Sequence, residues 1–225
     1  MALNARNAPG GGKEFPKMEA GTYPCRVVHV LDLGKQPQRP WQGQEKPPAD
    51  EMALTYEFVD EFMVDEDGEP MEDKPRHLTE IFVLYNLDAE KAKSTARYHA
   101  LDPNEVHDGD WTKLINTPCM VTVVINPSKT IKGKTYENIA EVSPMRAKDA
   151  EKCPELINPA RVLDLGSPDI DVFRSLPKWQ QEKIASNLEF AGSDLEKLLE
   201  LIERKGEDKP ADNNKEGVDE DENPY

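Results

Sequence analysis

The stretch EMALTYEFV, Glu51–Val59, alternates apolar and polar side chains and so places Met52, Leu54, Tyr56 and Phe58 on one face. A period of two residues is typical of a β-strand with one buried face. Such a strand needs hydrogen-bonded partners on its edges. The chain is therefore expected to build a sheet around this segment.

Four other segments read as strands, because they are short, apolar and rich in β-branched or aromatic residues: 21–33, 76–87, 118–126 and 134–143. A helix is expected from Asp88, a suitable N-cap, to about Leu101. The loop 34–50 holds four prolines and two glycines, which exclude a helix or a central strand. Asp67-Gly68 is a hairpin-turn signal between the second and third strands.

The resulting order is three strands, one helix and two strands. This order fits the OB-fold, a five-stranded Greek-key barrel with its helix between strands three and four, which binds oligonucleotides or oligosaccharides. An α+β sandwich with the same linear order is the competing fold. We expect a mainly β protein with an OB-fold core.

We expect four parts: a flexible N-terminal arm (1–20), the OB-fold domain (21–148), a helical extension (149–205) and a disordered acidic tail (206–225). Two helices are expected in the extension, the second opened by a Ser193 cap with Glu196 three residues later. The tail holds eight acids and two lysines and lacks the apolar surface to fold. VLDLG occurs at 30–34 and at 162–166, and because the flanking sequences differ we treat the repeat as coincidence.

Net charge is -16 over 225 residues, which would ordinarily argue against nucleic acid. The acids are concentrated in the tail and in the block 60–73, however. Residues 1–50 carry seven basic side chains against five acids, and residues 120–148 carry five against two. Both regions are locally basic. No apolar stretch is long enough to span a bilayer, and no signal peptide is recognisable, so a protein inside a cell is expected.

Catalytic and metal-binding patterns do not emerge from the spacing. PGGGKEF has Glu14 where a phosphate loop needs Ser or Thr. The histidines and the three cysteines show no metal-ligand spacing, and we interpret Cys25, Cys119 and Cys153 as buried apolar residues. We expect a protein without catalytic residues, metal or cofactor.

Binding single-stranded DNA without reading its sequence requires cations for the phosphates and exposed aromatic rings for the bases. The loop 34–50 offers Trp41 among three basic residues, although a ring folded back on the barrel is the alternative. The second loop offers three lysines near a tyrosine, and in an OB-fold these two loops rim one groove. Two sheet tyrosines are weaker candidates, since sheet aromatics are more often core. The candidates are Lys35, Arg39, Trp41, Lys46, Tyr56, Tyr85, Lys129, Lys132, Lys134 and Tyr136.

With these residues in view, VLDLGKQPQRPWQGQEK followed by LTYEF resembles the beginning of the single-stranded DNA-binding proteins of bacteriophages, which have an OB-fold. The likeness continues through LYNL and SLPKWQQEKI to the tail, over about two-thirds of the chain. It implies a protein that coats and protects single-stranded DNA in phage replication, recombination or repair, in the cytoplasm of the infected bacterium. No base contact is carried over from the family.

The ending DEDENPY resembles the acidic, aromatic-terminated tails of proteins with this function, which bind polymerases, helicases or nucleases, although Tyr225 stands where phenylalanine is usual. The expected partner-binding residues are Asp219, Glu220, Asp221, Glu222, Pro224 and Tyr225. The acids could also compete with DNA for the groove. A homo-oligomer is possible and no membrane partner is expected. The main alternative is a protein-binding module or DNA mimic that inhibits a host nucleic-acid enzyme; an enzyme and a virion protein are weaker ones.

Overall fold

The computed structural model describes residues 16–207, with side chains as far as residue 204. It is a mainly β structure whose sheet has the strand order β3-β2-β1-β4-β5, with β6 attached to β1. The five strands of this path run antiparallel to their neighbours. Their bounds are β1 Gly21–Gln36, β2 Ala49–Val64, β3 Pro70–Val83, β4 Pro118–Pro127 and β5 Thr135–Pro144.

All five strands expected from the sequence are present, and the alternation in β2 has the predicted effect. Met52, Leu54, Tyr56 and Phe58 all lie in one apolar cluster, here called the inner core. This cluster lies on the side of the sheet that faces α1 (Lys93–Leu101) and the 3-10 helix η2 (Trp111–Leu114). All three cysteines are free and buried, as predicted.

The helix predicted from Asp88 begins later than expected, at Lys93. Asp88 lies instead in a turn, where its backbone N–H donates to Asn86 Oδ1 at 3.0 Å. Ala92 stands at the helix N-cap without a side-chain hydrogen bond. The cap prediction was wrong because the competing turn at Asn86 satisfies the backbone first.

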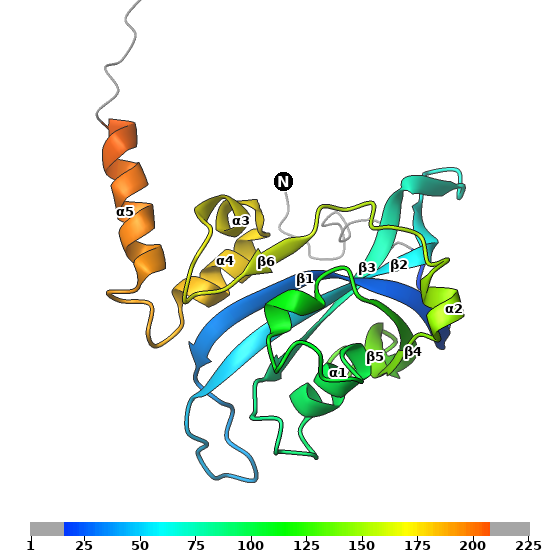
Figure 1. Ribbon diagram of the computed structural model, residues 1–225, viewed down its shortest axis with the longest axis horizontal. Coiled ribbons are helices and arrows are strands. Elements are labelled where there is room, and N and C mark those ends of the chain that lie inside the picture. Colours follow the sequence, from blue (N-terminus) through cyan, green and yellow to red (C-terminus); the bar gives the residue numbers. More distant parts are fainter. Residues whose placement is uncertain (1–15, 208–225) are drawn as a thin grey trace, which may run out of the picture.

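The C-terminal segment is more than a helical extension, because it also adds a strand to the sheet. β6 (Arg161–Leu163) pairs in parallel with β1. The helices of this segment are α2 (Ala147–Ala150), α3 (Ile170–Ser175), α4 (Lys178–Ala185) and α5 (Asp194–Glu207). Figure 1 shows α3 and α4 on one side of β1 and β2, with α1 on the other side.

A second apolar cluster, the outer core, joins this extension to the sheet. Leu31, Leu33 and Ala53 contribute from the sheet, and Phe173, Ile184 and Leu195 from the three helices. The Ser193 cap is present: Ser193 Oγ accepts from Glu196 N at 3.2 Å, although the Glu196 carboxylate accepts from Gly192 N. One outer face of β1 and β2 is therefore covered by the chain itself.

Within the N-terminal arm predicted for residues 1–20, the described residues 16–20 contact the sheet. Met18 is buried, and Lys17 Nζ donates to Thr135 Oγ1 at 2.7 Å. Residues 1–15 of the predicted arm lie outside the described residues. At the other end, Gly206 and Glu207 belong to α5, and residues 208–225 lie outside the described part as well.

Gly34 provides a test of how the extension sits on β1. Its φ is +71°, and a Cβ there would lie 2.7 Å from Asn187 Cγ. Asn187 cannot move freely, because its side chain bonds Ile184 O and Glu189 N. Gly43, with φ +80°, has nothing within 4 Å of such a Cβ and is the matched control.

Both Gly→Ala variants should lose roughly 1–2 kcal/mol to the left-handed backbone. Gly34→Ala should lose about 1 kcal/mol or more beyond Gly43→Ala, because it also overpacks the contact with Asn187. Urea unfolding of the two variants measures the difference. Equal losses would show that the contact between Gly34 and Asn187 is loose.

Candidate nucleic-acid interface

Trp41 stands on the tip of a short hairpin in the loop between β1 and β2. Its backbone exchanges two hydrogen bonds of 2.9 Å with Gln44. The two residues between them, Gln42 and Gly43, have φ of 51° and 80°, as a two-residue hairpin turn requires. The indole is 59% exposed, and Lys46 Nζ lies 5.9 Å from its ring centroid. The ring therefore projects into solvent and does not fold back on the sheet.

The other cations predicted for this loop differ in their charge balance. Lys35, the next-to-last residue of β1, forms an ion pair with Glu189 of the extension, and that contact raises the pKa of Lys35. Arg39 is exposed, and no carboxylate in the described part of the chain pairs with it. Arg39 and Lys46 are thus the cations of this loop that have no carboxylate partner among the described residues, while the charge of Lys35 is already paired with Glu189.

The second aromatic ring stands at the start of β5, just after the loop that joins β4 to β5. Tyr136 is 43% exposed, and Lys134 Nζ lies 5.3 Å from its ring centroid. Ser128 Oγ accepts from Ile131 N at 2.9 Å, and Ser128 N donates to Lys134 O at 2.7 Å, so the loop is closed by its own hydrogen bonds. Lys129 and Lys132 are exposed on it. This loop repeats the pairing of lysine and aromatic ring seen at Trp41.

A cationic hollow of about 420 Å³ adjoins the second loop. Lys17, Arg76, His77 and Lys134 line it together with Tyr136 and the apolar Met63 and Leu78. Arg76 Nη1 pairs with Glu137 Oε1 at 3.3 Å, so part of its charge is balanced. Lys17, Arg76 and His77 could not be predicted from the sequence, because they meet only where β3 packs beside β5 and beside residues 16–18, which precede β1.

The two loops lie near opposite ends of β3. The first adjoins the C-terminal end, where Leu84 N donates to Asp50 O, and the second adjoins Arg76 at the other end. From Arg76 to Val83 the strand spans roughly 23 Å. Between the ends, His77, Thr79 and Ile81 of β3 are exposed on one face. A strip of accessible sheet therefore connects the two loops.

The two sheet tyrosines have opposite outcomes. Tyr56 is fully buried in the inner core and donates its hydroxyl to Glu80 Oε1 at 2.9 Å. The prediction that Tyr56 faces the groove was wrong, because Glu80 on the neighbouring strand supplies the partner that lets the hydroxyl be buried. Tyr85, just after β3, is 53% exposed and remains a candidate.

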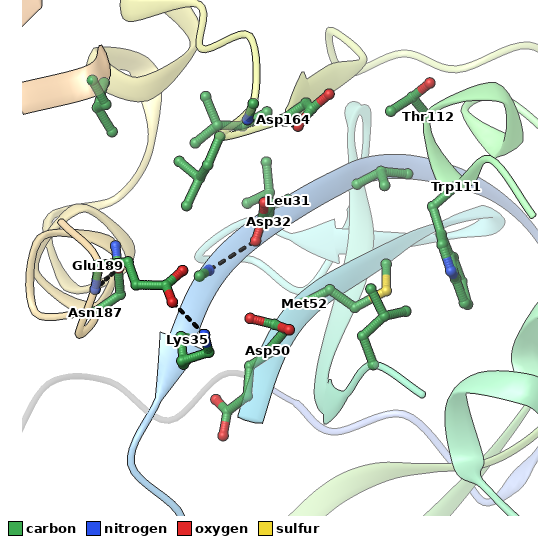
Figure 2. A pocket seen from close by; sticks show the side chains of 18 of the residues that line it. Leu31, Asp32, Lys35, Asp50, Met52, Trp111, Thr112, Asp164, Asn187 and Glu189 are labelled. Atoms are coloured by element: carbon green, nitrogen blue, oxygen red, sulfur yellow. Dashed lines mark hydrogen bonds and ion pairs between the residues drawn. The ribbon is translucent and has the colours of Figure 1, made fainter. Parts of the chain in front are cut away.

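An acidic pocket of about 550 Å³ lies at the end of the sheet where the first loop begins. Figure 2 shows Asp32, Asp50, Asp164 and Glu189 around it, together with the apolar side chains of Leu31 and Met52. Burial raises the pKa of Asp32, and nearby Asp164 and Asp50 act in the same direction. A phosphate would be repelled here. Within the described residues no group of His, Cys, Asp or Glu is arranged to hold a metal ion.

The predicted tail contacts from Asp219 to Tyr225 lie outside the described residues. No helix in the described part of the chain is long and apolar enough to cross a membrane. Comparison of the sequence with protein-family models and with curated proteins finds no match in either.

Proposed function

We propose that this protein binds single-stranded DNA without sequence preference, and without turnover. The observation that carries the proposal is the pair of loops that each present an exposed aromatic ring with a lysine beside it, Trp41 with Lys46 and Tyr136 with Lys134. Stacking of bases on aromatic faces, combined with cations for the backbone, is how proteins bind single strands of any sequence. The exposed strip of β3 between the loops gives a strand a continuous path.

The proposal includes an OB-fold for residues 21–148. The strand order β3-β2-β1-β4-β5 ends in two edge strands that side chains bridge, and this supports a closed barrel. Arg76 of β3 pairs with Glu137 of β5, and Arg97 of α1 bonds both Glu80 of β3 and Ala140 O of β5. The helix between the third and fourth strands agrees with the same fold.

Single-stranded DNA suits this surface better than a duplex does. The bases of a duplex are already stacked on one another, so exposed rings on separate loops would have no base face to bind. An unpaired strand offers those faces, and each base–aromatic stack contributes roughly 1–3 kcal/mol. The overall negative charge is compatible with this role because the acidic pocket is a separate surface from the cationic hollow.

We further propose that the acidic tail binds replication or recombination proteins, such as a polymerase, helicase or nuclease, and competes with DNA for the cationic surface. Its acids would steer the segment toward basic surfaces, and Tyr225 would provide the apolar anchor. The support is the sequence of residues 206–225 alone. Coating and protection of DNA in a phage-infected cell is the setting that this design fits.

Titration of a labelled oligothymidine of roughly thirty bases tests both proposals, since this length exceeds a single OB-fold site. The full chain should bind with an affinity that falls as salt rises, with a log-log slope of about -0.7 per phosphate contacted. A chain ending at Glu207 should bind more tightly. Fluorescence anisotropy measures both. Absence of binding by both forms at low salt would refute DNA binding, whereas equal affinities would refute only the competition by the tail.

A protein-binding role is the second candidate, and the acidic pocket is the observation that favours it. Carboxylates together with apolar side chains suit a segment that carries lysine or arginine beside an apolar side chain. On this alternative the chain would bind basic proteins at Asp50 and Asp164 and would not bind oligonucleotides. The same titration separates the two functions.

A further inference from the structure

Two six-residue segments far apart in the chain lie side by side as matching strands. The first is His29-Val-Leu-Asp-Leu-Gly34 in β1, and the second is Arg161-Val-Leu-Asp-Leu-Gly166, which begins β6. Their pairing is parallel and in register: His29 opposes Arg161, Val30 opposes Val162, and Leu31 opposes Leu163. We expected this repeat to be a coincidence, but its two copies pair with each other in one sheet.

The two copies also share one hydrogen bond, which the aspartate side chain accepts from the glycine N–H, although Gly34 has a positive φ and Gly166 does not. Asp32 Oδ1 accepts from Gly34 N at 2.8 Å, and Asp164 Oδ1 accepts from Gly166 N at 2.8 Å. Leu31 and Leu163 both enter the outer core. The matching sequence thus places a buried leucine and an aspartate–glycine hydrogen bond at the same positions of each copy. The first position differs, being a histidine in β1 and an arginine in β6.

Arg161 differs from the other arginines that are at least partly buried. Arg26, Arg76 and Arg97 each pair with a carboxylate, namely Glu155, Glu137 and Glu80. Arg161 is half-buried, and no carboxylate among the described residues pairs with it. Its one hydrogen bond there joins Nη1 to His29 Nε2 at 3.1 Å. Although the described residues include many acids, none of those acids provides this guanidinium with a counter-ion.

The neighbourhood of Arg161 is electrically positive or neutral. Burial lowers the pKa of His29 to about 4, and the charges of Arg161 and His77 act in the same direction, so His29 is neutral near pH 7 and accepts the bond from Arg161. Thr55 lies opposite His29 on β2, and its hydroxyl bonds that of Thr79 on β3 at 2.8 Å.

Glu57 is the acid two residues after Thr55 on β2, and it opposes His77 of β3. Its carboxylate already accepts three hydrogen bonds from the extension, from Ile157 N, Asn158 N and Asn158 Nδ2 at 2.7–3.0 Å. Glu57 is also fully buried. It is therefore not a ready counter-ion for a group on the open part of the sheet.

We propose that Arg161 contacts a phosphate of the bound strand, so that the C-terminal extension supplies part of the DNA-binding surface. The inference rests on the proposed function and deepens it. β6 holds Arg161 next to His29, on the row of residues that continues through Thr55 to the exposed Thr79 of β3. Thr55 is fully buried, so within this row Thr79 is the residue that belongs to the exposed strip of β3. A guanidinium carries several N–H donors, so the bond to His29 leaves others for phosphate oxygens.

Salt-dependent titration with oligothymidine tests the contact in the full chain. Arg161→Gln should weaken binding roughly tenfold at low salt, as expected for a hydrogen bond to a charged group. It should also reduce the magnitude of the log-log salt slope by about 0.7. Arg161→Lys should keep most of the slope, because it keeps the charge. Arg174→Gln is the matched control, since Arg174 is an exposed arginine on α3 with no carboxylate partner among the described residues.

A second measurement needs no substitution. Phenylglyoxal modifies free guanidinium groups, and peptide mass analysis should show Arg161 protected when oligothymidine is bound, with Arg174 modified equally in both states. Unchanged modification of Arg161, or a salt slope for Arg161→Gln equal to that of Arg174→Gln, would overturn the inference while leaving DNA binding intact. A wild-type chain that binds no oligothymidine would overturn the proposed function and this contact together.

Discussion

Replacement of Glu80 by glutamine should lower the free energy of unfolding by about 3 kcal/mol or more, because it leaves a buried arginine without its counter-charge. Glu80 and Arg97 are 7% and 5% exposed and join through Nε–Oε1 and Nη2–Oε2 contacts of 2.7 and 3.2 Å. The same carboxylate pairs with Lys93 at 2.6 Å and accepts from the Tyr56 hydroxyl. One side chain thus joins β2, β3 and α1.

Urea denaturation of wild type and Glu80→Gln measures this loss. Glu72→Gln is the control, since Glu72 is an exposed residue of the same strand and the substitution is chemically identical. The control should change the unfolding free energy by less than about 0.5 kcal/mol. If the free energy of unfolding fell equally little in both variants, the ion pair between Glu80 and Arg97 would contribute less to stability than its burial indicates.

Removal of both exposed rings, Trp41→Ala with Tyr136→Ala, should weaken binding of oligothymidine by about 30-fold or more. Each stack is worth roughly 1–3 kcal/mol, and the two rings lie on separate loops, so their contributions should add. Two stacks at the lower limit give about 2 kcal/mol, and each 1.4 kcal/mol is a factor of ten in affinity. Anisotropy titration at fixed salt measures the loss for each single variant and for the pair.

Trp179→Ala is the matched control for this prediction. Trp179 lies on α4 and is 49% exposed, close to the 59% of Trp41, so its removal takes a comparable ring from a different surface. Its affinity should equal that of wild type. If Trp179→Ala weakened binding as much as Trp41→Ala, the path for DNA would cross the extension helices instead of the strip on β3.

Local patterns predicted the strands well because runs of β-branched and aromatic residues, and in β2 an alternation of apolar and polar side chains, are visible within a few residues. The buried set Met52, Leu54, Tyr56 and Phe58 follows directly from that alternation. The same rule could not say which buried tyrosine has a polar partner. A hydroxyl tolerates exposure, so the sequence leaves Tyr56 as a candidate for the groove. In the structure, Glu80 on the neighbouring strand is the buried acceptor of that hydroxyl.

The candidate site was predictable to the extent that it lies on loops. Trp41, Lys134 and Tyr136 stand in polar segments that cannot be packed, and their exposure follows from composition. Lys17, Arg76 and His77 were missed, since they meet only where the residues before β1 pack beside β3 and β5. Arg161 was missed for a different reason, because a three-residue strand such as β6 has too few residues to show a periodic pattern.

By itself, the sequence determined where the strands run, which of their faces are buried and which loops remain polar, because these properties depend on neighbours within a few residues. Only the tertiary structure decided which charges are available. Lys35 is paired with the carboxylate of Glu189, while Arg161 opposes the neutral His29 and has no carboxylate partner among the described residues. Each of these pairs joins residues more than a hundred positions apart, so no local pattern could reveal whether a given cation already has a partner.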